Sequence, residues 1–127
     1  MTEDPEGKKI LVIQTHGVET PNRTYSPLFY AMAAAAMEME VMVWFTMDGT
    51  NQLRKGAAEK VQLDPTSDVT LKTMLEQTIE SEVKLRVCQQ SLLLFDMTLD
   101  DVIDDVEILG ATSIIDLSLN ADHVMYF

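Results

Sequence analysis

Residues 9–49 have the sequence KILVIQTHGVETPNRTYSPLFYAMAAAAMEMEVMVWFTMDG, in which a helical pattern separates two short apolar runs. The first run, 9–15, is followed by the turn pair His16-Gly17, and the second run, 41–46, is ended by Asp48-Gly49. Short apolar runs bounded by turn residues are typical of strands that are buried on both faces of a parallel sheet. The stretch therefore predicts the order strand, helix, strand.

The helix between these strands is expected over residues 26–37. Ser26 is suited to the N-cap, and Pro27 to the first helical position. The helix is apolar nearly all round, whereas a helix that covers one face of a sheet needs a single apolar stripe. Its second apolar face is therefore expected either in a subunit interface or in deeper burial within the monomer.

The rest of the chain continues the alternation of strands and helices. Asp68 or Thr70 is expected to cap a helix, and another helix is expected to start at or just after Cys88. The remaining expected elements are strands at 84–88, 106–109 and 123–127, and helical segments at 53–60, from Thr98, and at 112–119. This order predicts an α/β fold, a three-layer α/β/α sandwich with a five-stranded parallel sheet, because parallel neighbours need crossover helices.

The length and composition restrict the class of protein. A chain of 127 residues is sufficient for one domain, expected over 8–127 after a disordered N-terminus at 1–7. The net charge of −12 repels phosphate and anionic lipid, so neither nucleic acid nor a membrane is an expected partner. The N-terminus lacks the pattern of a signal peptide, and one cysteine cannot form an internal disulfide. A reducing, cytoplasmic setting follows.

Ligands of open α/β sheets bind beyond the carboxyl ends of the strands. His123 begins the last strand and is expected at the opposite edge, far from the other histidine. No pair of Cys or His has zinc spacing, and no glycine-rich phosphate loop is present, so the sequence predicts neither a metal nor a cofactor. The candidates expected at the carboxyl edge are His16, Glu19, Asn22, Arg23, Tyr25, Asp48, Asn51 and Cys88.

Cys88 is either a small core side chain or a reactive thiol. A lone cysteine in a small protein is commonly buried and inert. Its expected place at a helix N-terminus, followed by Gln89, Gln90 and Ser91 with no carboxylate, instead favours the thiolate. Arg86 or Arg23 could add positive charge. Ser91 can hydrogen-bond the sulfur but cannot resolve it, which suits relay of a group to another protein.

Three segments give the chain its resemblance to a known family. They are the opening KKILVIQTHGVETPNRTYSPLFYAMAAAAMEMEVMVWFTMDGTNQLRKG, the central RVCQQSLLL and the ending DDVEILGATSIIDLSLNADHVMYF. In their order and spacing they resemble the DsrE/DsrF-like (TusD-like) family of small sulfur-relay proteins, from about Lys8 to Phe127. Many members of that family have glycine in the turn after the cysteine helix, where this chain has Asp96.

The resemblance implies a cytoplasmic homotrimer or homohexamer whose active cysteine, here Cys88, accepts sulfur as a persulfide. The sulfur would come from a donor protein or a low-molecular-weight persulfide, and would pass to an acceptor protein. Arg23 would stabilise the anion, and His16 would exchange protons, with Asp48, Asn51, Gln89 and Ser91 as further site residues. Some family members lack the cysteine, so a non-enzymatic oligomeric module that binds a small ligand or partner is the alternative.

Overall fold

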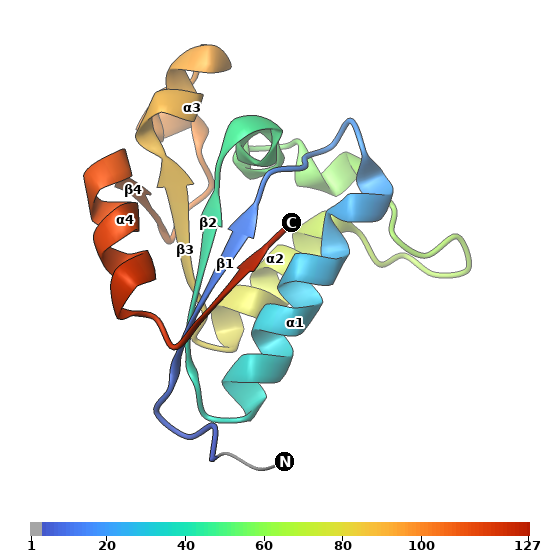
Figure 1. Cartoon of the computed structure of the whole chain (residues 1–127). Helices are drawn as coiled ribbons and strands as arrows, with labels where there is room; N and C mark the ends of the chain where they lie inside the picture. The colour runs from blue at the N-terminus through green and yellow to red at the C-terminus, as the bar shows by residue number, and fades with distance from the viewer. Residues whose placement is uncertain (1–3) are drawn as a thin grey trace.

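The computed structural model describes residues 4–127, which form a five-stranded parallel sheet with helices on both faces (Figure 1). The strand order is β4-β3-β2-β1-β5, and every neighbouring pair is parallel. The strands are β1 (Lys9–Gln14), β2 (Glu40–Phe45), β3 (Lys84–Cys88), β4 (Val106–Leu109) and β5 (His123–Tyr126). The predicted α/β fold and all five strands are confirmed.

Eight helical segments connect the strands in the described part of the chain. The α-helices are α1 (Tyr25–Ala36), α2 (Leu71–Glu80), α3 (Gln89–Leu94) and α4 (Ala111–Asn120). The 3-10 helices are η1 (Pro21–Arg23), η2 (Met47–Leu53), η3 (Ala58–Lys60) and η4 (Leu99–Asp101). None of the helices within residues 4–127 is long and apolar enough to cross a membrane.

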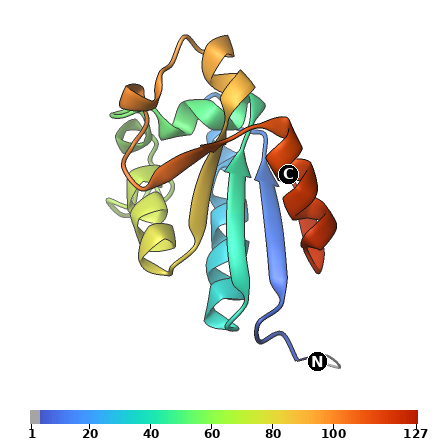
Figure 2. The same cartoon turned by 90° about the vertical axis from the view of Figure 1, so that its left-hand side faces the viewer.

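The two faces of the sheet are covered unequally. Helices α1 and α2 lie side by side on one face, while α4 alone lies on the other and leaves β2 and β3 uncovered there (Figures 1 and 2). This division follows from right-handed crossovers, because the chain moves from β1 to β4 in one direction across the sheet and returns to β5 in the other. The main core lies under α1 and α2, where Val12, Leu28 and Val43 are fully buried.

Helix α1 begins at Tyr25, two residues earlier than a Ser26 cap with Pro27 at the first helical position predicts. Thr24 has helical backbone angles and continues the turn of η1, and its hydroxyl donates to the carbonyl of Pro21 at 2.7 Å. Pro27 then occupies the third helical position, where its missing N–H costs nothing because first-turn N–H groups have no partner within the helix.

The outer face of α1 is exposed. Phe29 is 61% exposed and Tyr30 is 51% exposed, although the Tyr30 ring stacks on Phe127 with 5.8 Å between centroids. Deeper burial within the monomer, one of the two expectations for this face, is therefore wrong.

The helix expected over residues 53–60 does not form. Two short 3-10 helices, η2 and η3, lie there instead, and Gly56 between them has a φ of 85°. A residue with positive φ cannot continue an α-helix, so the segment turns.

The two ends of the chain lie as follows. Part of the expected disordered N-terminus, residues 1–3, lies outside the described residues, and beyond it the Gly7 N–H donates to the Glu38 carbonyl at 2.9 Å. His123 begins β5 and pairs with Ile10 near the start of β1, so it lies at the amino edge of the sheet as predicted.

Candidate functional site

Cys88 is the last residue of β3 and the N-cap of α3, as the sequence predicts. In the sheet, Phe45 of β2 pairs with Val87 of β3, which places the next residues, Thr46 and Cys88, at neighbouring strand ends. The Cys88 side chain is buried, with 7% of its surface exposed, and it forms no disulfide. The Cys88 sulfur thus lies at the carboxyl edge of the sheet, where the residue at the end of β3 and the residue after β2 are neighbours.

Ser91 and Thr46 complete what we call the thiol cluster, which consists of Thr46, Met47, Cys88, Gln90 and Ser91. The Met47 N–H donates to Ser91 Oγ at 2.8 Å, and Thr46 Oγ1 lies 3.3 Å from Ser91 Oγ. Because Ser91 already accepts from a backbone N–H, its own hydrogen is free to be donated. The cluster can therefore direct hydroxyl hydrogens at the sulfur.

These groups act directly on the thiol. Burial raises the pKa of Cys88, but hydrogen bonds from the Ser91 and Thr46 hydroxyls and from the N–H groups of Ser91 and Gln90 lower it, and the net pKa is below its ordinary value. Hydrogen bonds to the charged form favour that form, so the site stabilises a thiolate. Since α3 has only six residues, these local bonds rather than a long helix dipole account for the stabilisation.

Neither of the arginines that the sequence suggested as charge partners is among the groups that lower the pKa of Cys88. Arg86 donates to the Leu85 carbonyl at 2.9 Å and lies 3.4 Å from the Glu107 carboxylate. Arg23 is exposed in η1, and its carbonyl accepts from Gln14 Nε2 at 3.1 Å. The Cys88 anion is thus held by neutral donors instead of by these cations.

A second group of hydrogen-bonded residues, the loop cluster, joins the loop after β1 to η2. It consists of His16, Gly17, Val18, Glu19 and Asn51. Glu19 accepts from the Gly17 N–H at 2.8 Å and from Asn51 Nδ2 at 2.7 Å, while Asn51 Oδ1 accepts from the Val18 N–H at 2.8 Å. These bonds tie the loop after β1 to η2.

The hydrogen-bond donors around Glu19 favour the ionised form of its carboxyl group. Burial raises its pKa, whereas the hydrogen bonds from Asn51 and the backbone, together with the charge of His16, lower it, so that the net pKa is below the ordinary value. His16 Nδ1 lies 3.4 Å from the Thr20 hydroxyl, and the His16 carbonyl accepts from Gln52 at 2.8 Å. Of the residues that the sequence predicts for the site, the structure therefore places His16 and Asn51 in the loop cluster, and Ser91 beside Cys88.

Two glycines hold these loops close together. A Cβ on Gly17 would overlap Asn51 Oδ1 and the Asp48 carbonyl, and a Cβ on Gly49 would overlap the Gln14 carbonyl. The turn pairs that end both apolar runs of the sequence are thus required for close approach of one loop to the other. Asp48 contributes its carbonyl here, and its side chain is exposed.

Sequence reasoning missed Thr46 and Gln14. Thr46 directly follows β2, so the rule that selected Asp48 could have found it. Gln14 is fully buried and binds both ends of the loop, since its Nε2 donates to the Arg23 and Thr24 carbonyls and its Oε1 accepts from the His16 N–H. Gln14 is a polar residue at the end of an otherwise apolar strand, and that exception to the pattern could have identified it.

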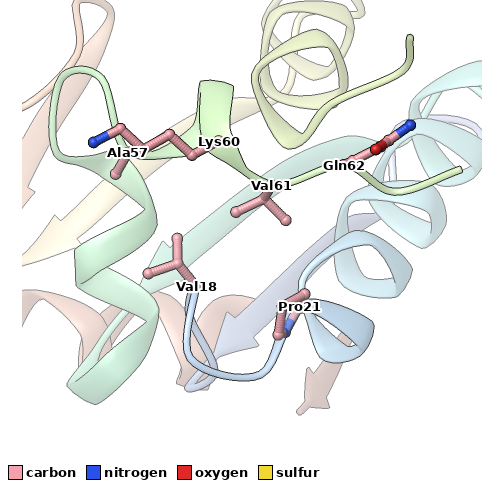
Figure 3. A pocket seen from close by; sticks show the side chains of 6 residues that line it. All are labelled: Val18, Pro21, Ala57, Lys60, Val61 and Gln62. Carbon is pink, nitrogen blue, oxygen red and sulfur yellow. The ribbon is translucent and has the colours of Figure 1, made fainter. Parts of the chain in front are cut away.

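A cavity of about 410 Å³ lies beside the loop after β1 (Figure 3). Its lining combines that loop with the η3 segment: Val18, Pro21, Ala57, Lys60, Val61 and Gln62. Lys60 is the charged residue in this lining, and Cys88 does not contribute to it. The cavity is therefore separate from the thiol cluster.

Comparison with known proteins gives a consistent result. The sequence profile of the DsrE/DsrF-like family matches residues 8–127. The sulfur carrier protein DsrE2 of Allochromatium vinosum is 26% identical, and the match covers 95% of this chain and 99% of that protein. This coverage means that the two proteins are similar over nearly their whole lengths.

Solved structures share the fold. The ychN protein of E. coli superposes with a TM-score of 0.78 at 20% identity, covering 94% of this chain and 99% of that chain. The protein of unknown function MTH1491 from Methanobacterium thermoautotrophicum superposes with a TM-score of 0.67 at 12% identity, with the same coverage.

Proposed function

Because the chain belongs to the DsrE/DsrF-like family, we propose that it is a sulfur carrier that holds sulfane sulfur as a persulfide on Cys88 and passes it to an acceptor protein. The observation that carries the proposal is the set of four donors around the sulfur, from Ser91, Thr46 and two backbone N–H groups, which lowers the pKa of Cys88 despite burial. A thiolate is the form of cysteine that attacks sulfur.

The reaction consists of two exchanges with no net oxidation. In the first, the Cys88 thiolate attacks the outer sulfur of a donor persulfide, R–S–SH. An S–S bond forms to Cys88, the donor S–S bond breaks, and the donor leaves as a thiolate. In the second, an acceptor thiolate attacks the outer sulfur of Cys88–S–SH, takes the SH group, and releases the Cys88 thiolate. Donors that stabilise the Cys88 thiolate increase the fraction of thiol that is ionised for the first exchange and make Cys88 a better leaving group in the second.

The neighbours of Cys88 have different roles in this proposal. Ser91 and Thr46 stabilise the anion, and the Gln90 N–H assists them. Gln89, exposed in the first turn of α3, borders the site. Asn51 and Glu19 fix the loop after β1, while Arg23, His16 and Asp48 lie at the same edge, where an incoming protein would meet them.

We further propose a cytoplasmic homotrimer or homohexamer as the working form. A cytoplasmic setting keeps a lone thiol reduced. The exposed apolar face of α1, with Phe29 and Tyr30, is the surface expected to contact a second copy.

The test is intact-protein mass spectrometry after incubation with a low-molecular-weight persulfide. We expect the mass of one added sulfur atom on the wild-type protein and no addition on Cys88→Ser. Ser118→Ala, which changes a serine on α4, serves as the control and should load normally. No addition on the wild type with any persulfide donor, together with the slow alkylation of an ordinary thiol, would instead favour a non-enzymatic binding module.

A further inference from the structure

Exposed apolar side chains border the thiol cluster. Leu93 is 79% exposed, Leu94 is 75% exposed and Met47 is 55% exposed. The two leucines lie in the second half of α3, which projects beyond the carboxyl ends of the strands (Figure 1). Met47 joins them at the site because its N–H donates to Ser91 Oγ. We call these three residues the leucine patch.

Neither the core nor the turn that ends α3 explains these exposed leucines. The turn is closed by backbone bonds, in which the Met97 N–H donates to the Leu92 carbonyl at 2.9 Å and the Asp96 N–H to the Leu93 carbonyl at 3.2 Å. Leu92 and Met97 supply the buried apolar contacts of this segment, at 4% exposure each. Leu93 and Leu94 are therefore dispensable for the fold and available to another molecule.

The charge around the patch indicates what covers it. Asp48 directly follows Met47 and Asp96 follows Leu94 by two residues; both are exposed, and the described residues form no ion pair with either. Arg54, which donates to the Phe95 carbonyl at 2.8 Å, acts together with Lys55 on the Asp101 carboxylate. In a chain of net charge −12, a second copy would bring more negative charge to this surface, whereas a basic partner would complement it.

Burial of the Cys88 sulfur restricts how an acceptor protein can approach it. Because only 7% of Cys88 is exposed, the sulfur of an acceptor protein can reach it only when the acceptor's surface lies against the residues around it. Leu93 and Leu94 end the six-residue helix that begins after Cys88, so an acceptor that covers this short helix contacts them.

We propose that the leucine patch is the docking surface for the acceptor, a protein whose thiol is flanked by apolar residues and by Lys or Arg. The inference rests on the proposed function, since it takes the acceptor to be a thiol protein. Apolar contact with Leu93 and Leu94 slows dissociation of the acceptor. The aspartates beside the patch increase the association rate of a basic partner and select it by charge.

The test uses a mixed disulfide instead of a persulfide, so that it does not depend on sulfur uptake. Cys88 is converted with 5,5′-dithiobis(2-nitrobenzoic acid) to its thionitrobenzoate disulfide. A peptide thiol then attacks, the S–S bond breaks, and the coloured thionitrobenzoate leaves. The probes are two synthetic peptides in which one cysteine is flanked by leucines and by either lysines or glutamates, and 2-mercaptoethanol as a small thiol.

We expect the lysine peptide to react about tenfold faster than the glutamate peptide at low salt, with the difference falling as salt is added. Leu93→Ser/Leu94→Ser should react with the lysine peptide several-fold more slowly than the wild type and react normally with 2-mercaptoethanol. Ile115→Ser/Leu119→Ser on α4, which also replaces two exposed apolar side chains, is the matched control and should behave as the wild type.

Equal rates for the two peptides, or an unchanged rate in the leucine variant, would overturn the proposal. So would a change in the sedimentation mass of the leucine variant, because the patch would then lie between copies of the chain. If the peptide preference holds while persulfide loading fails, the docking surface stands and the sulfur-carrier function falls. If no mixed disulfide forms at all, Cys88 is inert and both fall.

Discussion

The thiol cluster and the loop cluster lie at the same edge of the sheet and are built alike, yet they differ in what their hydrogen bonds accomplish. In the loop cluster, donors from Gly17 and Asn51 meet a Glu19 carboxylate that is ionised at neutral pH, so the bonds hold a loop. In the thiol cluster, donors meet Cys88, which is protonated in its ordinary state, so the bonds change its ionisation. Similar hydrogen bonds therefore fix a loop at one place and lower the pKa of a thiol at the other.

The largest expected effect separates the two clusters by chemistry. Cys88→Ser should abolish sulfur loading from a persulfide donor, because the nucleophile is lost, while Glu19→Gln should load fully. Intact mass spectrometry of both variants measures the difference. Normal loading of Cys88→Ser would show that the sulfur is held elsewhere in the chain.

Removal of one hydrogen-bond donor from the thiol cluster tests whether these donors set the pKa of Cys88. Ser91→Ala should raise the pKa of Cys88 and slow its alkylation by iodoacetamide near neutral pH, since a smaller fraction of the thiol is then ionised. Thr46→Val, which removes the other hydroxyl at similar volume, should slow it less. Rates measured across a pH series give the pKa directly, and an unchanged profile in Ser91→Ala would contradict the assigned role.

Disruption of the loop cluster should affect stability and leave the thiol unchanged. Asn51→Ala removes the partners of the Val18 N–H and the Glu19 carboxylate, at a cost of about 1–2 kcal/mol in the free energy of unfolding. Urea denaturation measures the loss, with Asn22→Ala, exposed in η1, as the control. A shift in the alkylation profile of Asn51→Ala would mean that the clusters are coupled.

The smallest expected effect concerns pH. The pKa of Glu19 lies below its ordinary value of 4.5 in the folded chain, so its contribution to stability is present above that value and is lost as the pH falls through the folded pKa. The stability difference between the wild type and Glu19→Gln should therefore shrink on acidification below pH 4.5 and stay below about 1 kcal/mol throughout, because Glu19 is exposed. Thermal unfolding of both proteins over that pH range measures the stability difference. A difference that does not change with pH would contradict the assigned role of Glu19 ionisation.

The apolar runs and turn residues of the sequence were sufficient to predict the sheet. The turn after α3 shows what the sequence left open: Asp96 takes a left-handed φ of 51°, and the turn closes with the Met97 N–H bonded to the Leu92 carbonyl. Thr70 caps α2, accepting from the Thr73 N–H at 3.4 Å. Such a cap depends on residues a few positions apart, which a sequence displays.

The thiol cluster could be predicted only in part, because its partners are distant in the chain. Ser91 lies within three residues of Cys88 and was expected beside it, but Thr46 is 45 residues from Ser91 and reaches it only through the register of β2 and β3. The engagement of Arg86 with Glu107 depends in the same way on the pairing of β3 with β4. Strand register, more than residue type, decides which groups meet the sulfur.

The central claim is that Cys88 carries sulfur that it can give up, and a loading and unloading cycle tests it most directly. The protein is loaded with a low-molecular-weight persulfide, freed of donor, and treated with an excess of a small thiol while its intact mass is followed. We predict a gain of one sulfur atom, followed by return to the original mass with one equivalent of sulfur recovered as the persulfide of the small thiol or as the hydrogen sulfide that this persulfide releases with further thiol. A protein that gains no sulfur, or that gains it and does not release it, would contradict the account.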